Sequence, residues 1–156
     1  MSFKIVAVGQ KLPDWVETGV NEYIRRMPPE ALTVVVPVRA EKRSPSRTTQ
    51  QVVAMEGKRI LSVTSPRDYL LVLDERGERI TTHQLAQALE GFLREGQEVV
   101  FVIGGADGLD ASVKEKAKKI WRLSDLTLPH ALVRVVLAEQ LYRAMSLLKK
   151  HPYHRE

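Results

Sequence analysis

The stretch that decides the fold is Glu98-Val99-Val100-Phe101-Val102-Ile103, followed at once by Gly104-Gly105-Ala106-Asp107-Gly108. The first six residues form the most apolar strand-like run in the chain, which is typical of a central strand buried on both faces of a parallel sheet. The glycines that follow are typical of a tight turn from such a strand into a helix. The stretch therefore predicts a parallel sheet with a glycine loop at the end of a central strand.

Segments typical of strands and of helices alternate on both sides of this stretch. Asp74-Glu75-Arg76-Gly77 predicts a turn that ends one strand, and Pro37 predicts that another strand lies at an edge or ends there. The alternation predicts one α/β domain over residues 1–156, with a mostly parallel sheet and helices on both faces. Strands are expected at 3–8, 32–38, 69–73 and 98–103, a strand or loop at 123–128, and helices at 13–27, 48–62, 81–96, 110–120 and 129–150.

The composition excludes several classes of protein. The 156 residues include no Cys, which excludes disulfides, thiolate metal sites and thiol nucleophiles. The 44% hydrophobic and 28% charged content is typical of a globular chain. The apolar runs are too short for a bilayer, which requires about 20 residues, and the N-terminus lacks the features of a signal peptide. We therefore expect a cytoplasmic protein with no membrane partner.

The positive charge lies in the last third of the chain. Residues 1–110 hold 14 basic and 15 acidic side chains, whereas residues 111–156 hold 10 basic and 4 acidic ones, a net charge of +6. Such an asymmetry favours a surface that faces a polyanion. The alternative is a solvated basic face without a partner.

In sheets of this kind, ligands bind beyond the carboxyl ends of the strands, which directs attention to Leu73-Asp74, 104–108 and 126–130. The glycine loop, residues 104–108, lacks both the Gly-Lys-Ser/Thr ending and the G-x-G-x-x-G spacing of phosphate-binding loops. With Asp107 inside it, the loop favours a ligand with hydroxyls or positive charge, such as S-adenosylmethionine. The alternative is a turn whose glycines serve only the backbone conformation.

The end of the chain carries a second group of candidates. The tail His151-Pro152-Tyr153-His154-Arg155-Glu156 combines proton-transfer, stacking and anion-binding side chains, although a frayed end is the alternative. Arg134 and Arg143 interrupt an apolar helix and need partners or a ligand there. His83, His130, His151 and His154 come with neither Cys nor a carboxylate cluster, so no metal site is predicted.

These residues carry a resemblance to a known family. The run Leu126-Thr127-Leu128-Pro129-His130-Ala131-Leu132-Val133-Arg134-Val135, then Glu139-Gln140-Leu141-Tyr142-Arg143-Ala144, and the tail resemble the signature of the RlmH family, the pseudouridine-N3 methyltransferases of large-subunit ribosomal RNA within the SPOUT superfamily. Val6-Ala7-Val8-Gly9 and Pro13-Asp14-Trp15-Val16 extend the resemblance to the N-terminus. It covers nearly the whole chain but is poor at residues 39–47.

The resemblance implies a SPOUT-type fold with a deep C-terminal trefoil knot, and a homodimer. It implies methylation at N3 of a pseudouridine in the helix-69 loop of 23S rRNA within assembled ribosomes, with S-adenosylmethionine as the methyl donor and no metal. The implied cofactor site comprises Leu73, Gly104, Gly105, Ser124, Asp125, Leu126, Thr127, Leu128 and Pro129.

The implied chemistry leaves the catalytic roles open. His154 or His130 would accept the N3 proton, Arg143 or Arg155 would stabilise the anion or hold phosphate, and Tyr153 would stack on the base or hydrogen-bond to it. The competing class is a non-catalytic basic RNA- or ribosome-binding module. An α/β enzyme with a nucleotide cofactor is a third alternative, which the absent phosphate motifs weaken.

Overall fold

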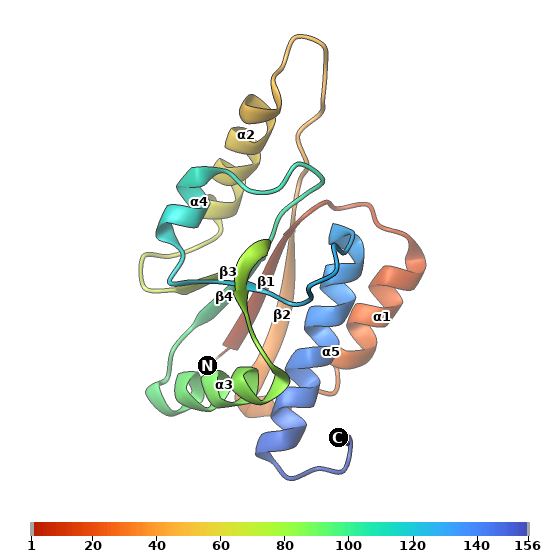
Figure 1. Ribbon diagram of the computed structural model, residues 1–156, viewed down its shortest axis with the longest axis vertical. Coiled ribbons are helices and arrows are strands. Elements are labelled where there is room, and N and C mark those ends of the chain that lie inside the picture. The colour runs from red at the N-terminus through yellow and green to blue at the C-terminus, as the bar shows by residue number, and fades with distance from the viewer. Residues whose placement is uncertain (1, 156) are drawn as a thin grey trace.

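The computed structural model describes residues 2–155 and contains one five-stranded sheet (Figure 1). The strand order is β2-β1-β4-β3-β5, and every neighbouring pair is parallel. The expected parallel sheet, the central position of residues 99–103 and the edge position of the strand with Pro37 are all confirmed. The strands are β1 (Ser2–Val8), β2 (Leu32–Val38), β3 (Tyr69–Arg79), β4 (Val99–Ile103) and β5 (Lys119–Arg122).

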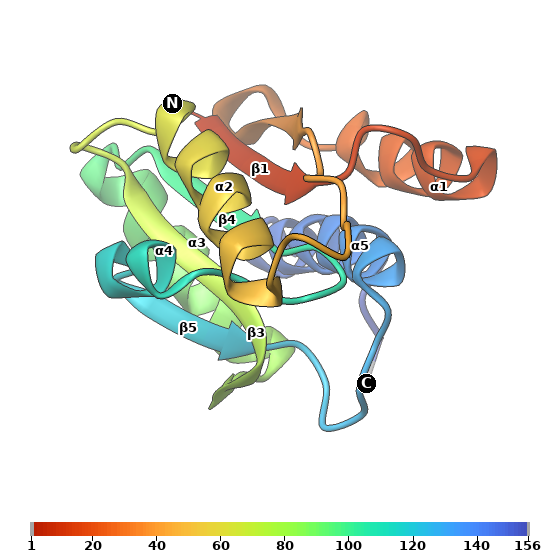
Figure 2. The same ribbon diagram turned by 90° about the horizontal axis from the view of Figure 1, so that it is seen from above.

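Helices cover both faces of the sheet, as Figure 2 shows from above. The helices α1 (Asp14–Ile24), α3 (Thr82–Glu95) and α5 (His130–Leu148) lie on one face, and α2 (Thr49–Ser62) and α4 (Ala111–Lys116) lie on the other. Side chains of β4 alternate between the two sides: Phe101 packs in the cluster with α3 and α5, and Val102 in the cluster with α2 and α4. A short 3-10 turn, η1 (Pro29–Ala31), precedes β2.

Local signals set the helix ends that the sequence predicted. The hydroxyls of Thr48 and Thr81 each accept a hydrogen bond from the backbone N–H three residues later, and the side-chain oxygen of the Gln at that position accepts one from the N–H of the Thr. These capping boxes satisfy amide groups that the first turn of a helix leaves unpaired. Gly96 ends α3 in the left-handed conformation, with φ of 67°.

Two predicted elements are wrong because sheet pairing decides them. The strand expected to end at Leu73 continues to Arg79, and the predicted turn 74–77 is an irregularity in its pairing with β5. Gly77 makes this possible, since a Cβ there would lie 2.7 Å from the carbonyl oxygen of Ile120. The strand therefore crosses closely over the backbone of β5.

The lysine-rich helix expected to reach Ile120 is also shorter. It ends at Lys116, and the backbone N–H of Lys118 donates to the carbonyl of Leu70 (2.7 Å). This bond leads the chain into β5, so tertiary pairing overrides the local preference for helix. Residues 123–128, expected as strand or loop, are a loop.

The last helix, α5, is apolar on nearly all sides. Leu137 and Leu141 are buried against the sheet, whereas Leu132 and Val136 lie on the opposite side, half-buried and outside all three hydrophobic clusters. Within residues 2–155, no helix has both the length and the apolar character needed to span a membrane.

Candidate functional site

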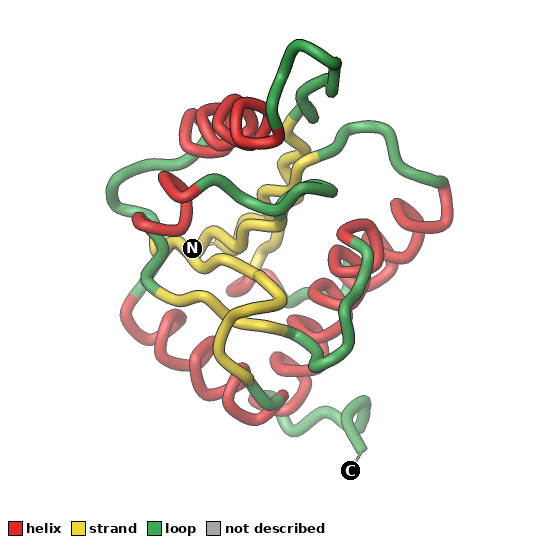
Figure 3. The backbone as a smooth tube through the Cα atoms, turned by 45° about the horizontal axis from the view of Figure 1, so that its top comes forward, coloured by secondary structure: helices red, strands yellow, loops and turns green. Residues whose placement is uncertain are grey.

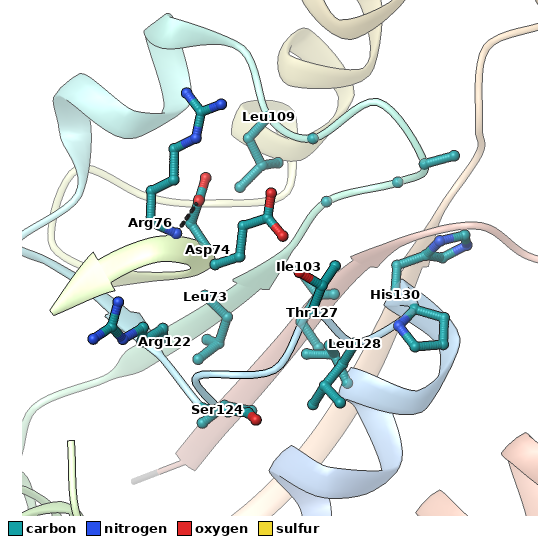
Figure 4. A pocket seen from close by; sticks show the side chains of 18 of the residues that line it. Leu73, Asp74, Arg76, Ile103, Leu109, Arg122, Ser124, Thr127, Leu128 and His130 are labelled. Carbon is teal, nitrogen blue, oxygen red and sulfur yellow. Dashed lines mark hydrogen bonds between the residues drawn. The ribbon is translucent and has the colours of Figure 1, made fainter. Parts of the chain in front are cut away.

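A cavity of about 810 Å³ lies where β4 ends and its pairing with β3 stops (Figure 4). This volume is within the usual range for small-molecule sites, about 300–1,000 Å³. The walls are residues 73–76 of β3, the glycine loop, the loop that leads to α5, and the first turn of α5. In Figure 4, Leu73 and Ile103 are the last residue pair of β3 and β4, and Thr127, Leu128 and His130 come from the loop and helix. The position agrees with the rule that parallel sheets bind ligands beyond the carboxyl ends of their strands.

The glycine loop is tightly packed against its surroundings. A Cβ at Gly104 would lie 2.9 Å from the carbonyl oxygen of Gly108, and one at Gly105 would lie 3.1 Å from Cγ1 of Val8. Gly108 has φ of +83°, and its N–H donates to the carbonyl of Gly105 (3.1 Å). The absence of side chains therefore serves the loop's own packing, and the loop forms one fixed wall of the cavity.

Two carboxylates at the cavity are already paired. Asp74 lies 3.0 Å from Nζ of Lys114 and accepts the backbone N–H of Arg76 (2.8 Å). Burial works against ionisation of Asp74, but these hydrogen bonds and the positive charges outweigh it and lower its pKa. Asp107 pairs with Arg43 at 2.8 Å. The expectation that Asp107 attracts a positive ligand is therefore weakened, since a guanidinium offsets its charge.

Eight of the nine cofactor residues implied by the resemblance line this cavity: Leu73, Gly104, Gly105, Ser124, Leu126, Thr127, Leu128 and Pro129. Asp125 is outside the lining and pairs with Arg79 (2.6 and 3.0 Å) and Arg122 (3.2 Å). Arg76, Lys114, Arg122 and Val133 also line the cavity, although they are not among the implied cofactor residues. Nothing in the sequence signals that Arg76 and Lys114 lie at the cavity, because their positions depend on how β3 continues beyond Leu73 and on where α4 lies.

The implied catalytic residues fall into two places. His130 lines the cavity. Arg143, Tyr153 and His154 instead form a cluster on α5 around Glu139, to which Arg143 donates at 2.7 Å and the Tyr153 hydroxyl at 2.7 Å. Arg155 is exposed. The guanidinium of Arg143 also lies 4.9 Å from the centre of the Tyr153 ring. We call Glu139, Arg143, Tyr153 and His154 the tail cluster.

The tail cluster has a defined pattern of proton donors and acceptors. Nη1 of Arg143 lies 3.2 Å from Nδ1 of His154, and because a guanidinium only donates, Nδ1 is the acceptor. Burial, followed by the hydrogen bond to Glu139, raises the pKa of Tyr153, so its phenol stays protonated at neutral pH. Tyr153 is therefore a hydrogen-bond donor in this arrangement and not a base.

The tail is docked rather than frayed. Lys150 adopts a left-handed conformation with φ of 57°, and the N–H of His151 donates to the carbonyl of Ser146 (2.8 Å). The chain thus reverses at the end of α5 and returns to Glu139. Because Arg143 follows His130 by 13 positions on one helix, these two residues lie about 20 Å apart along its axis, whereas Glu139 of the tail cluster lies only about 9 Å beyond Val133 of the cavity wall.

Arg134, which interrupts the apolar side of α5, has its partners within the protein. Its Nη2 donates to the carbonyls of Val8 (2.8 Å) and Gly9 (2.7 Å), and the side chain is buried. Arg134 therefore ties the first turns of α5 to the end of β1. Across residues 2–155, no three His, Asp or Glu side chains gather where they could hold a metal ion.

Comparison with known proteins identifies the family. A family model described as predicted SPOUT methyltransferase matches residues 1–154. The chain belongs to the SPOUT methyltransferase family. Proteins named ribosomal RNA large subunit methyltransferase H are similar over their full length: that of Methylobacillus flagellatus is 48% identical, covering 100% of both chains, and that of Burkholderia thailandensis is 52% identical, covering 99% of each.

A solved structure shares the fold of this family member. It is described as a probable methyltransferase from Bordetella pertussis Tohama I, with a TM-score of 0.54 and 18% sequence identity over 92% of this chain and 95% of that one. At this identity the likeness concerns the fold alone.

Proposed function

We propose that the protein transfers the methyl group of S-adenosylmethionine to N3 of a pseudouridine in the helix-69 loop of 23S rRNA within assembled ribosomes. The observation that carries this proposal is the full-length similarity, at about half identity, to proteins named ribosomal RNA large subunit methyltransferase H. The cavity at the strand ends and the positive charge of residues 111–156 support a small cofactor and a polyanionic substrate.

The residues at the cavity fit S-adenosylmethionine. The cavity has the volume of a small-molecule site, and two loops, the glycine loop and the loop that leads to α5, form much of its wall. Residues that would hold the cofactor are Leu73, Gly104, Gly105 and residues 124–129, apart from Asp125. When bound, S-adenosylmethionine supplies an activated methyl group on a sulfonium.

The protein's own part in the reaction is to position the substrate and to manage one proton. Aligning the base with the methyl donor contributes a large share of the rate. The N3 proton must also leave, and His130 at the cavity or His154 in the tail cluster would accept it. A cation such as Arg143 or Arg155 would stabilise the resulting anion, and Tyr153 would donate to the base or stack on it.

A homodimer would bring the two halves of the site together. Arg143 of the tail cluster lies about 20 Å along α5 from His130 at the cavity of its own chain, and the apolar side chains of Leu132 and Val136 lie between these two residues on the outer side of α5. A second copy placed on this side would cover the apolar residues and set its tail against the cavity. The trefoil knot of the family is part of the same proposal.

One assay tests the proposed function. Ribosomes that lack the modification are incubated with the protein and S-adenosylmethionine with a labelled methyl group, and the modified nucleotide is located by mass spectrometry. We expect a single label, on N3 of a pseudouridine in the helix-69 loop. Label at another nucleotide would contradict the stated position.

The second candidate is a non-catalytic RNA-binding module, which the net charge of +6 in residues 111–156 favours. It predicts binding to ribosomes without affinity for S-adenosylmethionine. Calorimetric titration of the protein with S-adenosylmethionine separates the two candidates, because only the methyltransferase binds it.

A further inference from the structure

Residues 39–47, between β2 and α2, form a loop that the proposed function does not use. It holds Arg39, Lys42, Arg43 and Arg47 against one acidic residue, Glu41, and we call it the basic loop. In Figures 1 and 3 it extends beyond the end of the sheet, next to the first turn of α2. All four of its basic residues are exposed.

The base of the basic loop is fixed by Glu41. The Glu41 side chain is 11% exposed and pairs with Arg47 (2.9 Å) and with Arg59 of α2 (2.8 Å). Its backbone N–H donates to Oε2 of the buried Glu56 (2.9 Å). Arg47 and Arg59 are therefore both paired with a carboxylate of the protein itself, and these contacts hold the loop in a defined position on α2.

The other three cations of the loop are not held by this anchor. Within residues 2–155, Arg39 and Lys42 take part in no ion pair of the structure, and Arg43 reaches Asp107 of the glycine loop at 2.8 Å. Asp107 lines the cavity, so Arg43 places the basic loop directly at its rim. The side chain of Arg43 is 62% exposed, and an ion pair in this environment holds its partners weakly.

We propose that the basic loop binds the phosphate backbone of the RNA whose base enters the cavity, through Lys42, Arg43 and Arg39. Arginine binds phosphate through two parallel N–H groups, and Arg43 can exchange Asp107 for a phosphate because the existing pair is exposed. The loop thus adds an RNA-binding surface on residues outside the basic last third of the chain. The inference rests on the proposed RNA substrate.

The test compares two double variants that remove the same charge. Lys42→Gln/Arg43→Gln neutralises two cations of the basic loop, and Arg67→Gln/Arg94→Gln neutralises two exposed side chains at the opposite end of the sheet, shortly before β3 and β4 begin. Binding to ribosomes is measured by co-sedimentation at several salt concentrations, and S-adenosylmethionine affinity by calorimetry. Neither measurement requires methyl transfer.

We expect the loop variant to bind ribosomes about tenfold or more weakly than the control variant, with a salt slope reduced by about 0.7–0.9 for each phosphate that the loop no longer neutralises. Affinity for S-adenosylmethionine should not decrease. The wild-type protein could fail to methylate ribosomes while the loop variant still binds RNA more weakly than the control variant. That result would contradict the proposed function and would support RNA binding by the basic loop.

Three results would overturn the inference. One is equal ribosome binding by the loop and control variants. Another is a decrease in S-adenosylmethionine affinity as large as the decrease in RNA binding, which would give the loop a role in the cavity alone. The third is that the loop variant loses as much affinity for polyglutamate as for protein-free 23S rRNA. This result would show a general cationic surface without preference for RNA.

Discussion

Gly104 is the residue at which the glycine loop has least room. The Cβ of any other residue would meet both the carbonyl oxygen of Gly108 and Cγ of Leu109 at 2.9 Å. Gly105 differs, because its missing Cβ points toward Val8 and the Glu56 carboxylate, away from the cavity. A substitution at Gly105 therefore tests packing beneath the loop, whereas one at Gly104 changes the cavity wall itself.

Gly104→Ala should displace the loop and lower S-adenosylmethionine affinity by at least about tenfold, and overpacking should cost about 1–3 kcal/mol of unfolding free energy. The control is Gly91→Ala in α3, where a Cβ meets only the end of Arg94 at 3.9 Å. That change should stabilise the protein by about 1 kcal/mol, since Ala favours helix over Gly. Calorimetry and urea unfolding measure both effects, and unchanged cofactor affinity in Gly104→Ala would contradict the placement.

At the scale of elements, Asp74 joins the middle of β3 to α4 through Lys114. Its pKa is lowered in the folded protein, so its ion pair stabilises the fold above the ordinary pKa of 3.8 and ceases to do so as the pH falls through the lowered value. Asp74→Asn should therefore reduce stability at neutral pH by up to about 1 kcal/mol, because a partly exposed pair contributes little.

The difference between Asp74→Asn and the wild type should disappear as the pH falls from about 5 to below 3.8. Urea unfolding at a series of pH values measures it. Glu90→Gln on the exposed side of α3 is the control for the loss of one negative charge. A difference that persists at the lowest pH would show that Asp74 acts through packing and not through its charge.

Arg134 joins α5 to β1 through backbone carbonyls. Arg134→Leu leaves the carbonyls of Val8 and Gly9 without this donor and should cost about 1–3 kcal/mol of unfolding free energy. Arg94→Leu, at an exposed site in the last turn of α3, should change stability by less than about 0.5 kcal/mol. Thermal unfolding compares the two, and equal losses would mean that the buried hydrogen bonds contribute little.

The sequence predicted those elements whose signals are local. Thr48, Thr81 and Gly96 mark helix ends through bonds within one turn, and the apolar run of β4 marks a central strand. The strand β5 was missed because its helix-like lysines are outweighed by pairing with β3, which is distant in sequence.

In the candidate site, too, the sequence predicted the features with local signals and missed those that depend on contacts between distant residues. The strand-end rule located the cavity walls, since it requires only the order of elements. The pairs Arg43–Asp107 and Arg79–Asp125 join residues far apart in the chain, and nothing near either partner signals them. The docking of Tyr153 on Glu139 also depends on the reversal at Lys150, a residue type that seldom adopts positive φ.

For the whole molecule, the separation of cavity and tail cluster makes the tail a test of the proposed site. Deleting residues 151–156 removes the Tyr153 hydrogen bond to Glu139 and the hydrogen bond between Arg143 and His154, and none of these four residues lines the cavity. Affinity for S-adenosylmethionine should therefore be retained. Methyl transfer to ribosomes should fall by about 10²–10⁴-fold, as expected when a positioned acid–base group is removed. Full activity of the truncated protein would show that the tail has no part in the reaction.

The dimer proposal makes a stronger prediction, which concerns mixtures of two impaired proteins, assayed at an S-adenosylmethionine concentration that leaves Gly104→Ala largely without cofactor. Gly104→Ala has a damaged cavity and an intact tail, and the truncated protein has the reverse. If each site combines the cavity of one copy with the tail of the other, a mixed dimer contains one complete site. Equal amounts, exchanged to equilibrium, should then regain about one quarter of the wild-type activity, since about half of the dimers are mixed.

If each site is instead built within one chain, no combination of these two proteins contains a complete site and the mixture stays inactive. Light scattering must show the dimer mass for both proteins and for the mixture, because a monomer would remove the basis of the proposal. Recovery of activity in a dimeric mixture requires that the tail reaches the cavity of the neighbouring copy. His130 and Arg143 lie about 20 Å apart on α5 of one copy, so the Arg143 that acts at a given cavity would come from the neighbouring copy, and α5 would not have to move.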